Sequence, residues 1–506
     1  MDENTRNKAL AYSTIDGALS AVMGSLAGGM FLMGYAIKIL KADPAQIGML
    51  AALPMLANLV QIFGSIIIEK TGKKKALCFL SVFMSRILWV LIILLPFAIF
   101  APLADMRIWV LVAVIGASSV FGSIGGVSWL AWMSDLVPDN IRGSYFGKRN
   151  MIASAAGMVV ILLGGRFITM WEKKFSESDP YGFIILFVAG LISGLLAVAF
   201  LLRIPEPERT GEKTSAFDLK IFLRPLRDSN FLTLTLFVSA WIFGVQIAAP
   251  FYGVYMIDIL KVDFSSITIF GTFATFATLL MMKIWGPISD KLGNKPVIIV
   301  SGLVLVAVPF VWILAVPGAY YVPVMLAHML TGAFMAGAGL SQFNILIKLS
   351  PREGRSVYLA LFSAITGIFG AVSPVLGGAL SNMMKNVSFS VSGYSVSNLH
   401  IIFLISAGIQ AATMVFILKV HEQGAATPVA VVLQLGNDLN PQTGVSGAAD
   451  FVMIEAKKAD NILKKIDKYT DDLAGKSEDA VEKIINKGED MIKKPLNRIK
   501  DILKDD

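Results

Sequence analysis

The chain has 506 residues, of which 55% are hydrophobic and 16% are charged. An average soluble protein is about 45–50% apolar and about 25% charged, so a soluble fold of this composition would leave too much apolar surface in water. The formal net charge of +8 suits an anionic partner, but no basic patch with interleaved aromatic residues stands apart from the loops, and we expect no nucleic-acid partner. The lone Cys78 excludes an internal disulfide and a multi-cysteine metal site.

The amino-terminal residues 1–10 are polar and lead directly into a long apolar run. They lack the short apolar core and the small-residue cleavage site of a removable signal peptide, so we expect the first span to direct insertion. A helix that crosses the bilayer needs about 20 mainly apolar residues. Runs of this kind cover residues 11–38, 45–68, 76–100, 107–134, 145–170 and 181–203 in the first half, and 230–257, 264–289, 296–316, 320–348, 356–384 and 399–420 in the second.

These runs predict an all-α polytopic membrane protein with twelve transmembrane helices. The predicted organisation is a six-helix bundle at 1–203, a polar, proline-containing linker at 204–229, a second six-helix bundle at 230–420 and a polar tail at 421–506. Twenty Lys and Arg residues lie on one set of alternate loops and eight on the other. Because cytoplasmic loops carry the excess of basic residues, we expect both termini and the linker on the cytoplasmic side of an inner or plasma membrane.

Two loops recur in both halves, which indicates a duplicated six-span unit. SIIIEKTGKKK (65–75) follows the second span and GPISDKLGNKP (286–296) follows the eighth. Each carries an acid, a base, a variable residue, a glycine, one more residue and a base. A second pair, LVPDNIRGSYFGKRN (136–150) and LSPREGRSVYLALFS (349–363), places Arg142 over Arg355.

On these loops the chain resembles the major facilitator superfamily, over roughly residues 9–420. The hallmark loop of the family has the form G-x-x-x-D-[RK]-x-G-x-[RK]-[RK]. In this sequence Ser65 replaces the first glycine of the first copy, and Pro296 replaces the last base of the second copy. The first copy supplies Glu69, Lys70, Gly72 and Lys73, and the second supplies Gly286, Asp290, Lys291 and Gly293.

The resemblance implies two pseudo-symmetric bundles and a role for the loop acids. A carboxylate at the membrane boundary can pair with an arginine, or with the positive end of a helix, from the opposite bundle. Glu69 and Asp290 would then latch the cytoplasmic side when the cavity faces outward. The alternative is a solvated turn that only anchors the topology.

The eleventh span contains GIFGAVSPVLGG (367–378), which looks like the family's helix motif of Gly and Pro residues. Glycines let helix backbones approach closely, and proline loosens a helix. In exporters of the family this motif usually lies in the fifth span, where Ile161 stands at the equivalent of Pro374. Simple close packing is the alternative role of Gly370, Pro374, Gly377 and Gly378.

Few ionisable residues lie inside the predicted spans, and such residues usually face a cavity or an interior. Asp16 suits a cavity wall or the dipole of its own helix, and Arg86, about 16 Å into its span, suits a buried ion pair or a solute. His328 could carry a proton or stay neutral between helices. The candidate cavity residues are Asp16, Arg86, Trp129, Gln246, His328, Gln342 and Asn344.

The tail becomes polar from residue 421. Residues 424–450 read as a flexible connector, and apolar residues at helical spacing after it predict two or three short amphipathic helices. Helices of this type bind a protein partner, lie on the membrane or pair with another tail. We expect a regulatory or docking appendage.

The predicted function is movement of a small solute by alternating access, with the two bundles rocking around a site near the bilayer midplane. Spans 1, 4, 7 and 10 would line the cavity if the family arrangement holds. Proton coupling is a further hypothesis, motivated by Asp16 and His328. The alternative is a non-transporting sensor or scaffold that recruits a partner through its tail. We expect no enzyme activity, cofactor or metal, because no nucleophile–base pair, metal-ligand cluster or phosphate loop is found.

Overall fold

The computed structural model of the protein describes residues 3–97, 106–138, 141–206, 224–351, 355–391 and 394–439. The described helices up to residue 431 belong to one compact unit that contains both bundles, and a second unit begins at Val432. Most of the predicted linker, and the predicted amphipathic helices beyond residue 450, lie outside the described residues.

Among its described residues, the first bundle (residues 3–206) has ten helical segments. Some spans are broken into two or three of them by π-turns and local distortions. The segments are α1 (Glu3–Ala27), α2 (Gly29–Gly34), η1 (Tyr35–Ile39), α3 (Pro44–Leu59), α4 (Gln61–Thr71), α5 (Lys74–Ile87), α6 (Trp89–Leu94), α7 (Arg107–Leu136), α8 (Arg142–Lys174) and α9 (Tyr181–Leu202).

The second bundle (residues 224–420) follows the same order and is extended by a hairpin and a further helix. Its segments are η4 (Arg224–Arg227), α11 (Ser229–Gln246), α12 (Ala249–Val254), η5 (Tyr255–Ile259), α13 (Phe264–Leu292), α14 (Asn294–Ile313), α15 (Tyr321–Leu349), α16 (Arg355–Met383), β1 (Ser388–Val391), β2 (Tyr394–Ser397) and α17 (Asn398–Lys419), after which comes α18 (Pro428–Asp438).

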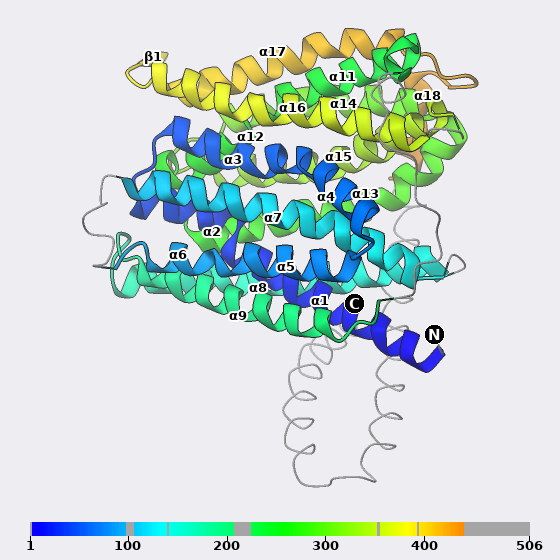
Figure 1. Cartoon of the computed structure of the whole chain (residues 1–506). Helices are drawn as coiled ribbons and strands as arrows, with labels where there is room; N and C mark the ends of the chain where they lie inside the picture. Colours follow the sequence, from blue (N-terminus) through cyan, green and yellow to red (C-terminus); the bar gives the residue numbers. More distant parts are fainter. Residues whose placement is uncertain are drawn as a thin grey trace, which may run out of the picture. The chain divides into compact units, whose positions relative to one another are not determined.

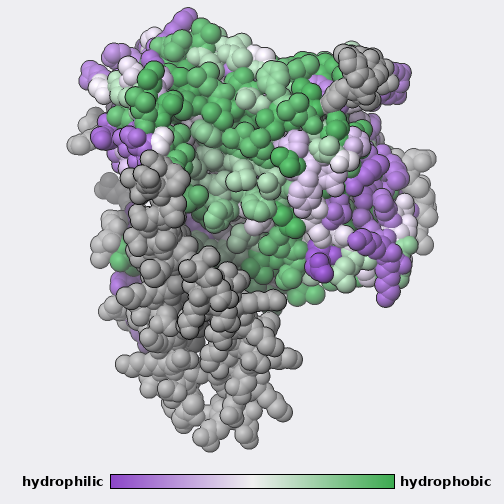
Figure 2. All heavy atoms as spheres, turned by 180° about the vertical axis from the view of Figure 1, so that it is seen from behind, coloured by the Kyte–Doolittle hydropathy of each residue, from purple (hydrophilic) through white to green (hydrophobic). Residues whose placement is uncertain are grey.

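The predicted set of twelve spans is confirmed. Twelve helices among the described residues are long and apolar enough to cross a bilayer, from Asn4–Ile39 to Asn398–Lys419. Hydrophobic side chains form a broad band between hydrophilic ends on the face seen in Figure 2, as expected for a surface in contact with lipid. The protein is therefore an all-α, multi-pass membrane protein.

Two details differ from the predicted elements. The strands β1 and β2 form an antiparallel hairpin, with Ser388 opposite Ser397, in a loop for which no strand was predicted. The helix α18 occupies part of the segment that was predicted to be a flexible connector. Its start suits a helix because Pro428 fits the first helical position, and Val431 is fully buried.

The spans run between two ends of the molecule, which we name by their loops. The motif end carries the hallmark loops after α4 and α13, and the far end carries η1, η5 and the β-hairpin; in Figure 1 the far end lies on the left. The most extensive contacts between the bundles are those of α3 with α16 and of α8 with α13, and α12 also touches α2 and α3.

A turn at the far end is repeated in both bundles, and the sequence analysis missed it. YAIKILKAD (35–43) and YMIDILKVD (255–263) share six of their nine residues. Each copy forms a π-helical turn, then a lysine in the left-handed conformation, with φ of 54° at Lys41 and 51° at Lys261. Asp43 and Asp263 then cap the helices that follow, α3 and α13. The duplication therefore extends to backbone detail.

Candidate functional site

The backbones of the two bundles approach closely at the far end because the glycines at this contact have no side chains. A Cβ atom on Gly48 of α3 would collide with the carbonyl of Pro374 in α16, and one on Gly378 would lie 2.9 Å from the Cα of Ala45. The Gly and Pro residues predicted as a packing motif thus lie in part at the contact between bundles.

The start of α13 inserts into the first bundle. Phe264 has no exposed surface, and its ring lies 6.1 Å from that of Phe31 and 5.5 Å from that of Phe183, measured between centroids. Gly34 makes room for it, because a Cβ atom there would overlap the Phe264 ring. We call these aromatic residues, Phe31, Phe183 and Phe264, the far-end seal.

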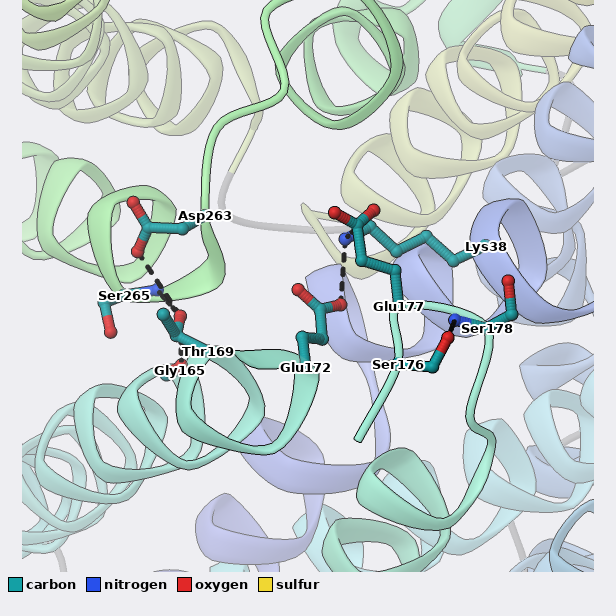
Figure 3. A network of polar contacts seen from close by, with 9 residues as sticks. All are labelled: Lys38, Gly165, Thr169, Glu172, Ser176, Glu177, Ser178, Asp263 and Ser265. Atoms are coloured by element: carbon teal, nitrogen blue, oxygen red, sulfur yellow. Dashed lines mark hydrogen bonds and ion pairs between the residues drawn. The ribbon is translucent and has the colours of Figure 1, made fainter. Parts of the chain in front are cut away.

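Polar contacts surround the seal and join the bundles (Figure 3). The amide of Ser265 donates to the Thr169 hydroxyl at 2.9 Å, and the Thr169 oxygen lies 3.3 Å from the Asp263 carboxylate. Asp263 also accepts from the Ser266 amide and hydroxyl at 3.1 and 2.7 Å. Partial burial alone would raise the pKa of Asp263, but these hydrogen bonds outweigh it and hold the pKa below its ordinary value.

A lysine from the repeated turn adds a charge to this network. The Lys38 ammonium lies 2.8 Å from Glu172 of α8 and 3.5 Å from Glu177. It also lies 5.3 Å from the centroid of the Phe264 ring, within the distance at which a cation is attracted to an aromatic face. Lys38 therefore contacts both bundles.

A cavity of about 590 Å³ adjoins the seal. It lies between α1 and α8 of the first bundle and α13 of the second. Met30 in its wall precedes Phe31, and Thr268 follows Phe264 by one helical turn. Its lining is Ala21, Ser25, Met30, Asn150, Ala153, Ser154, Gly157, Met158, Ile161, Ile267, Thr268, Gly271, Thr272 and Thr275.

Three of the seven candidate cavity residues lie in one buried polar cluster. An Arg149 guanidinium nitrogen lies 3.5 Å from the Asp16 carboxylate, and this guanidinium covers the face of Trp129 at 4.1 Å. Arg86 donates to the Ser20 hydroxyl at 2.7 Å, and Ser20 lies 3.4 Å from Asp16. The structure thus joins Asp16, Arg86 and Trp129.

The residue that links this cluster was not among the candidates. Arg149 is one of the twenty Lys and Arg residues that the sequence analysis assigns to the cytoplasmic loops. The helix α8 already begins at Arg142, which places Arg149 about two turns inside it. The guanidinium also donates to the Ser13 carbonyl at 3.0 Å.

The other four candidates lie apart from that cluster. The Gln246 amide lies 3.4 Å from the sulfur of Met55 in the opposite bundle. His328 lies between the rings of Phe270 and Trp312, with Nδ1 2.9 Å from the Val324 carbonyl. Gln342 and Asn344 are half-buried on α15. None of the seven candidates, all of which the structure describes, belongs to the cavity lining.

The motif loops form compact turns. Gly72 ends α4 in the left-handed conformation, with φ of 70°, and Gly293 has a φ of 95°. Asp290 and Lys291 are exposed. Lys74 pairs with Asp135 at 2.5 Å in the first bundle, and the side chains of Glu69 and Arg355 lie outside the described residues.

An acid beyond each bundle's last span caps its own motif loop. Glu206 accepts from the Lys75 amide at 2.9 Å. Glu422 accepts from the amides of Asn294 and Lys295 at 2.9 and 2.7 Å, and Lys348 lies 3.0 Å from it. Partial burial alone would raise the pKa of Glu422, but the Lys295 amide, the Asn294 side chain and Lys348 outweigh it and hold the pKa below its ordinary value.

The fold of this chain is similar to that of several solved membrane-transporter structures. A mutant of the nucleoside transporter NupG matches with a TM-score of 0.64 and 14% identity, over 82% of this chain and 100% of that one. A D-xylose-proton symporter matches with a TM-score of 0.62 and 14% identity, over 83% and 99%. A bacterial homologue of the iron transporter ferroportin in an inward-facing state matches with a TM-score of 0.60 and 13% identity, over 83% and 99%.

Comparison of sequences gives the family. No curated protein sequence matches the chain. The model of the Major Facilitator Superfamily matches residues 17–254 and again residues 232–433, so that the two matches together cover both bundles. The predicted resemblance is confirmed, and the chain belongs to the Major Facilitator Superfamily.

Proposed function

We propose that the protein is a secondary active transporter, not an enzyme, that moves a small solute by alternating access. The observation that carries this proposal is a cavity between the bundles next to a seal built from both of them. A side chain of the second bundle, Phe264, closes the far end against the first bundle. Such a contact can exist in one arrangement of the bundles and must break in the other.

The path of the second span supports an arrangement that is closed at the far end. Its far-end half, α3, packs on α16 of the opposite bundle as well as on α7 of its own, whereas its motif-end half, α4, packs chiefly on α7 of its own bundle. With the excess of Lys and Arg on the motif-end loops, this end faces the cytoplasm. The conformation is then inward-facing.

Solute flux tests the proposal. Purified protein in liposomes should accumulate or release a solute in response to a gradient, and Asp290→Ala should abolish the flux with folding intact. Asp290 is exposed in this conformation, as expected for a latch that engages only when the motif end closes. Retained flux in Asp290→Ala would remove the latch role, and absence of any flux in the parent protein would contradict transport.

Proton coupling is a finer proposal, supported by the pair of Asp16 and Arg149. Asp16 has an exposed fraction of 5% and lies within a span, where an ionisable group is costly unless it is paired or functional. Protonation of Asp16 would release Arg149 from its ion pair. Flux that does not respond to an imposed pH gradient would contradict coupling.

A scaffold function is the second candidate, supported by Glu422. Through this residue the segment after α17 is held on the second motif loop, so that binding of a partner to the tail could act on that loop. A chain truncated after residue 439 tests this alternative. If the protein is a scaffold, the truncated chain no longer binds the partner, and neither form shows flux. If it is a transporter, the truncated chain keeps its flux.

A further inference from the structure

The cavity between α1, α8 and α13 has polar groups on both walls. Ser25, Asn150 and Ser154 come from the first bundle, and Thr268, Thr272 and Thr275 from the second. A solute that bridges the two walls would therefore contact both bundles, as required of a site around which they rock. The space is open at Gly271, where an added Cβ atom would meet no atom within 4 Å.

The lining residues carry no ionisable side chain. The nearest charged group in the sequence, Arg149 beside Asn150, is already held by Asp16, the Ser13 carbonyl and the Trp129 ring. Transfer of an ion from water into a site without a counter-charge costs several kcal/mol. The cavity is therefore unsuited to an anion or a cation.

The wall formed by α13 presents acceptors. The hydroxyls of Thr268, Thr272 and Thr275 donate to backbone carbonyls within their own helix, at 2.9, 2.9 and 3.1 Å. A hydroxyl has one proton and two lone pairs, so these oxygens remain available to accept. The complementary solute carries O–H or N–H donors, and Asn150 on the opposite wall can both donate and accept.

We infer that this cavity binds a neutral solute that carries several hydroxyl or amide groups. The volume of about 590 Å³ falls within the range of about 300–1,000 Å³ that is usual for small-molecule sites, and it accommodates a sugar or a nucleoside. This inference rests on the proposed transport function and specifies its substrate class and site.

Thermal stability of the purified full-length protein tests the inference without transport. The probes are neutral monosaccharides, disaccharides, polyols and nucleosides, each beside a charged counterpart such as gluconate for glucose, glucosamine for glucose and uridine monophosphate for uridine. We expect at least one neutral probe to raise the Tm and its charged counterparts to leave the Tm unchanged. Stabilisation by charged members alone, or by no member of the panel, overturns the inference.

Variants locate the site. Gly271→Leu should remove the stabilisation by filling the cavity, and Thr272→Val should raise the Kd by about tenfold, the equivalent of one lost hydrogen bond. Gly408→Leu is the matched control, because Gly408 is exposed on α17 and an added Cβ atom meets nothing there. Stabilisation that survives Gly271→Leu overturns the assignment. A solute that binds but is never transported counts against the proposed function and leaves the binding site intact.

Discussion

Phe264 of α13 lies against Phe31 of α2, with 6.1 Å between ring centroids, so that a side chain of one bundle is enclosed by the other. Three separate features support this contact: the room left by Gly34, the ring of Phe183 and the ammonium of Lys38. In the proposed transport cycle this contact closes the far end of the cavity.

Phe264→Ala should weaken the seal. Truncation of a buried phenylalanine costs about 3–5 kcal/mol, and here that cost falls on the arrangement in which the far end is closed. We expect a lower Tm and faster labelling of Thr169→Cys from the far side by an impermeant maleimide, in a Cys78→Ser background. Phe276→Ala is the control, because Phe276 is on the same helix but 61% exposed. Equal labelling in the two variants would contradict the seal.

Gly48→Ala should hinder the close approach of α3 and α16. Its new methyl group would collide with the carbonyl of Pro374, and backbone atoms cannot move aside as a flexible side chain can. The same labelling assay should show a shift toward the open far end. Gly24→Ala is the control, since an added Cβ atom there meets nothing within 4 Å. Labelling that does not differ from this control would show that the contact is not needed for closure.

Arg149→Leu should destabilise the protein by leaving Asp16 without its ion-pair partner. Removal of one member of a buried pair costs on the order of 3 kcal/mol, although Arg86 remains nearby through Ser20. The Asp16→Asn/Arg149→Leu double variant should regain part of the lost Tm, because no unpaired carboxylate remains. Equal Tm values for the single and double variants would contradict the pairing. The control is Lys148→Leu, which removes a positive charge at an exposed neighbouring residue.

The segment after α17 should detach from the second motif loop in acid. The pKa of Glu422 is lowered in the folded protein, so its contribution to stability is complete above the ordinary value of 4.5 and is lost as the pH falls through the lower folded value. We expect the protection of the amides of residues 421–438 against hydrogen exchange, measured relative to the intrinsic rate at each pH, to fall below pH 4.5. In Glu422→Gln these amides should already be poorly protected at pH 7. Equal protection in the variant and the parent protein at pH 7 would show that Glu422 does not hold this segment on the second motif loop.

The twelve spans could be predicted because a long apolar run in a bilayer is stable as a spanning helix, in which all backbone groups are hydrogen-bonded. The motif loops could be predicted because each places a glycine between charged residues at a fixed spacing. The same reasoning could not predict contacts between the bundles, since Thr169 and Asp263 lie 94 residues apart. Thr169 is an ordinary residue of its span, and Asp263 lies in the turn before α13.

Part of the site had a signal in the sequence. YAIKILKAD (35–43) and YMIDILKVD (255–263) repeat at an offset of 220, from 255 − 35, and this repeat identifies the far-end turns that flank the seal. The cavity had no such signal. Its Ser, Thr, Gly and Ala residues are common in membrane helices, and only the fold brings them to one place. Gln342 and Asn344 on α15 were chosen as candidates because amide side chains are rarer in such helices.

A reversible cross-link across the seal tests alternating access most directly. Thr169 and Ser265 already touch, with 2.9 Å between the Thr169 oxygen and the Ser265 amide. The pair Thr169→Cys/Ser265→Cys, in a Cys78→Ser background, should form a disulfide that stops solute flux in liposomes, and reductant should restore the flux. The control is Ser85→Cys/Ser118→Cys, which joins hydroxyl positions 3.1 Å apart within the first bundle and should leave the flux unchanged. Full flux through protein that stays cross-linked between Thr169→Cys and Ser265→Cys would contradict the account.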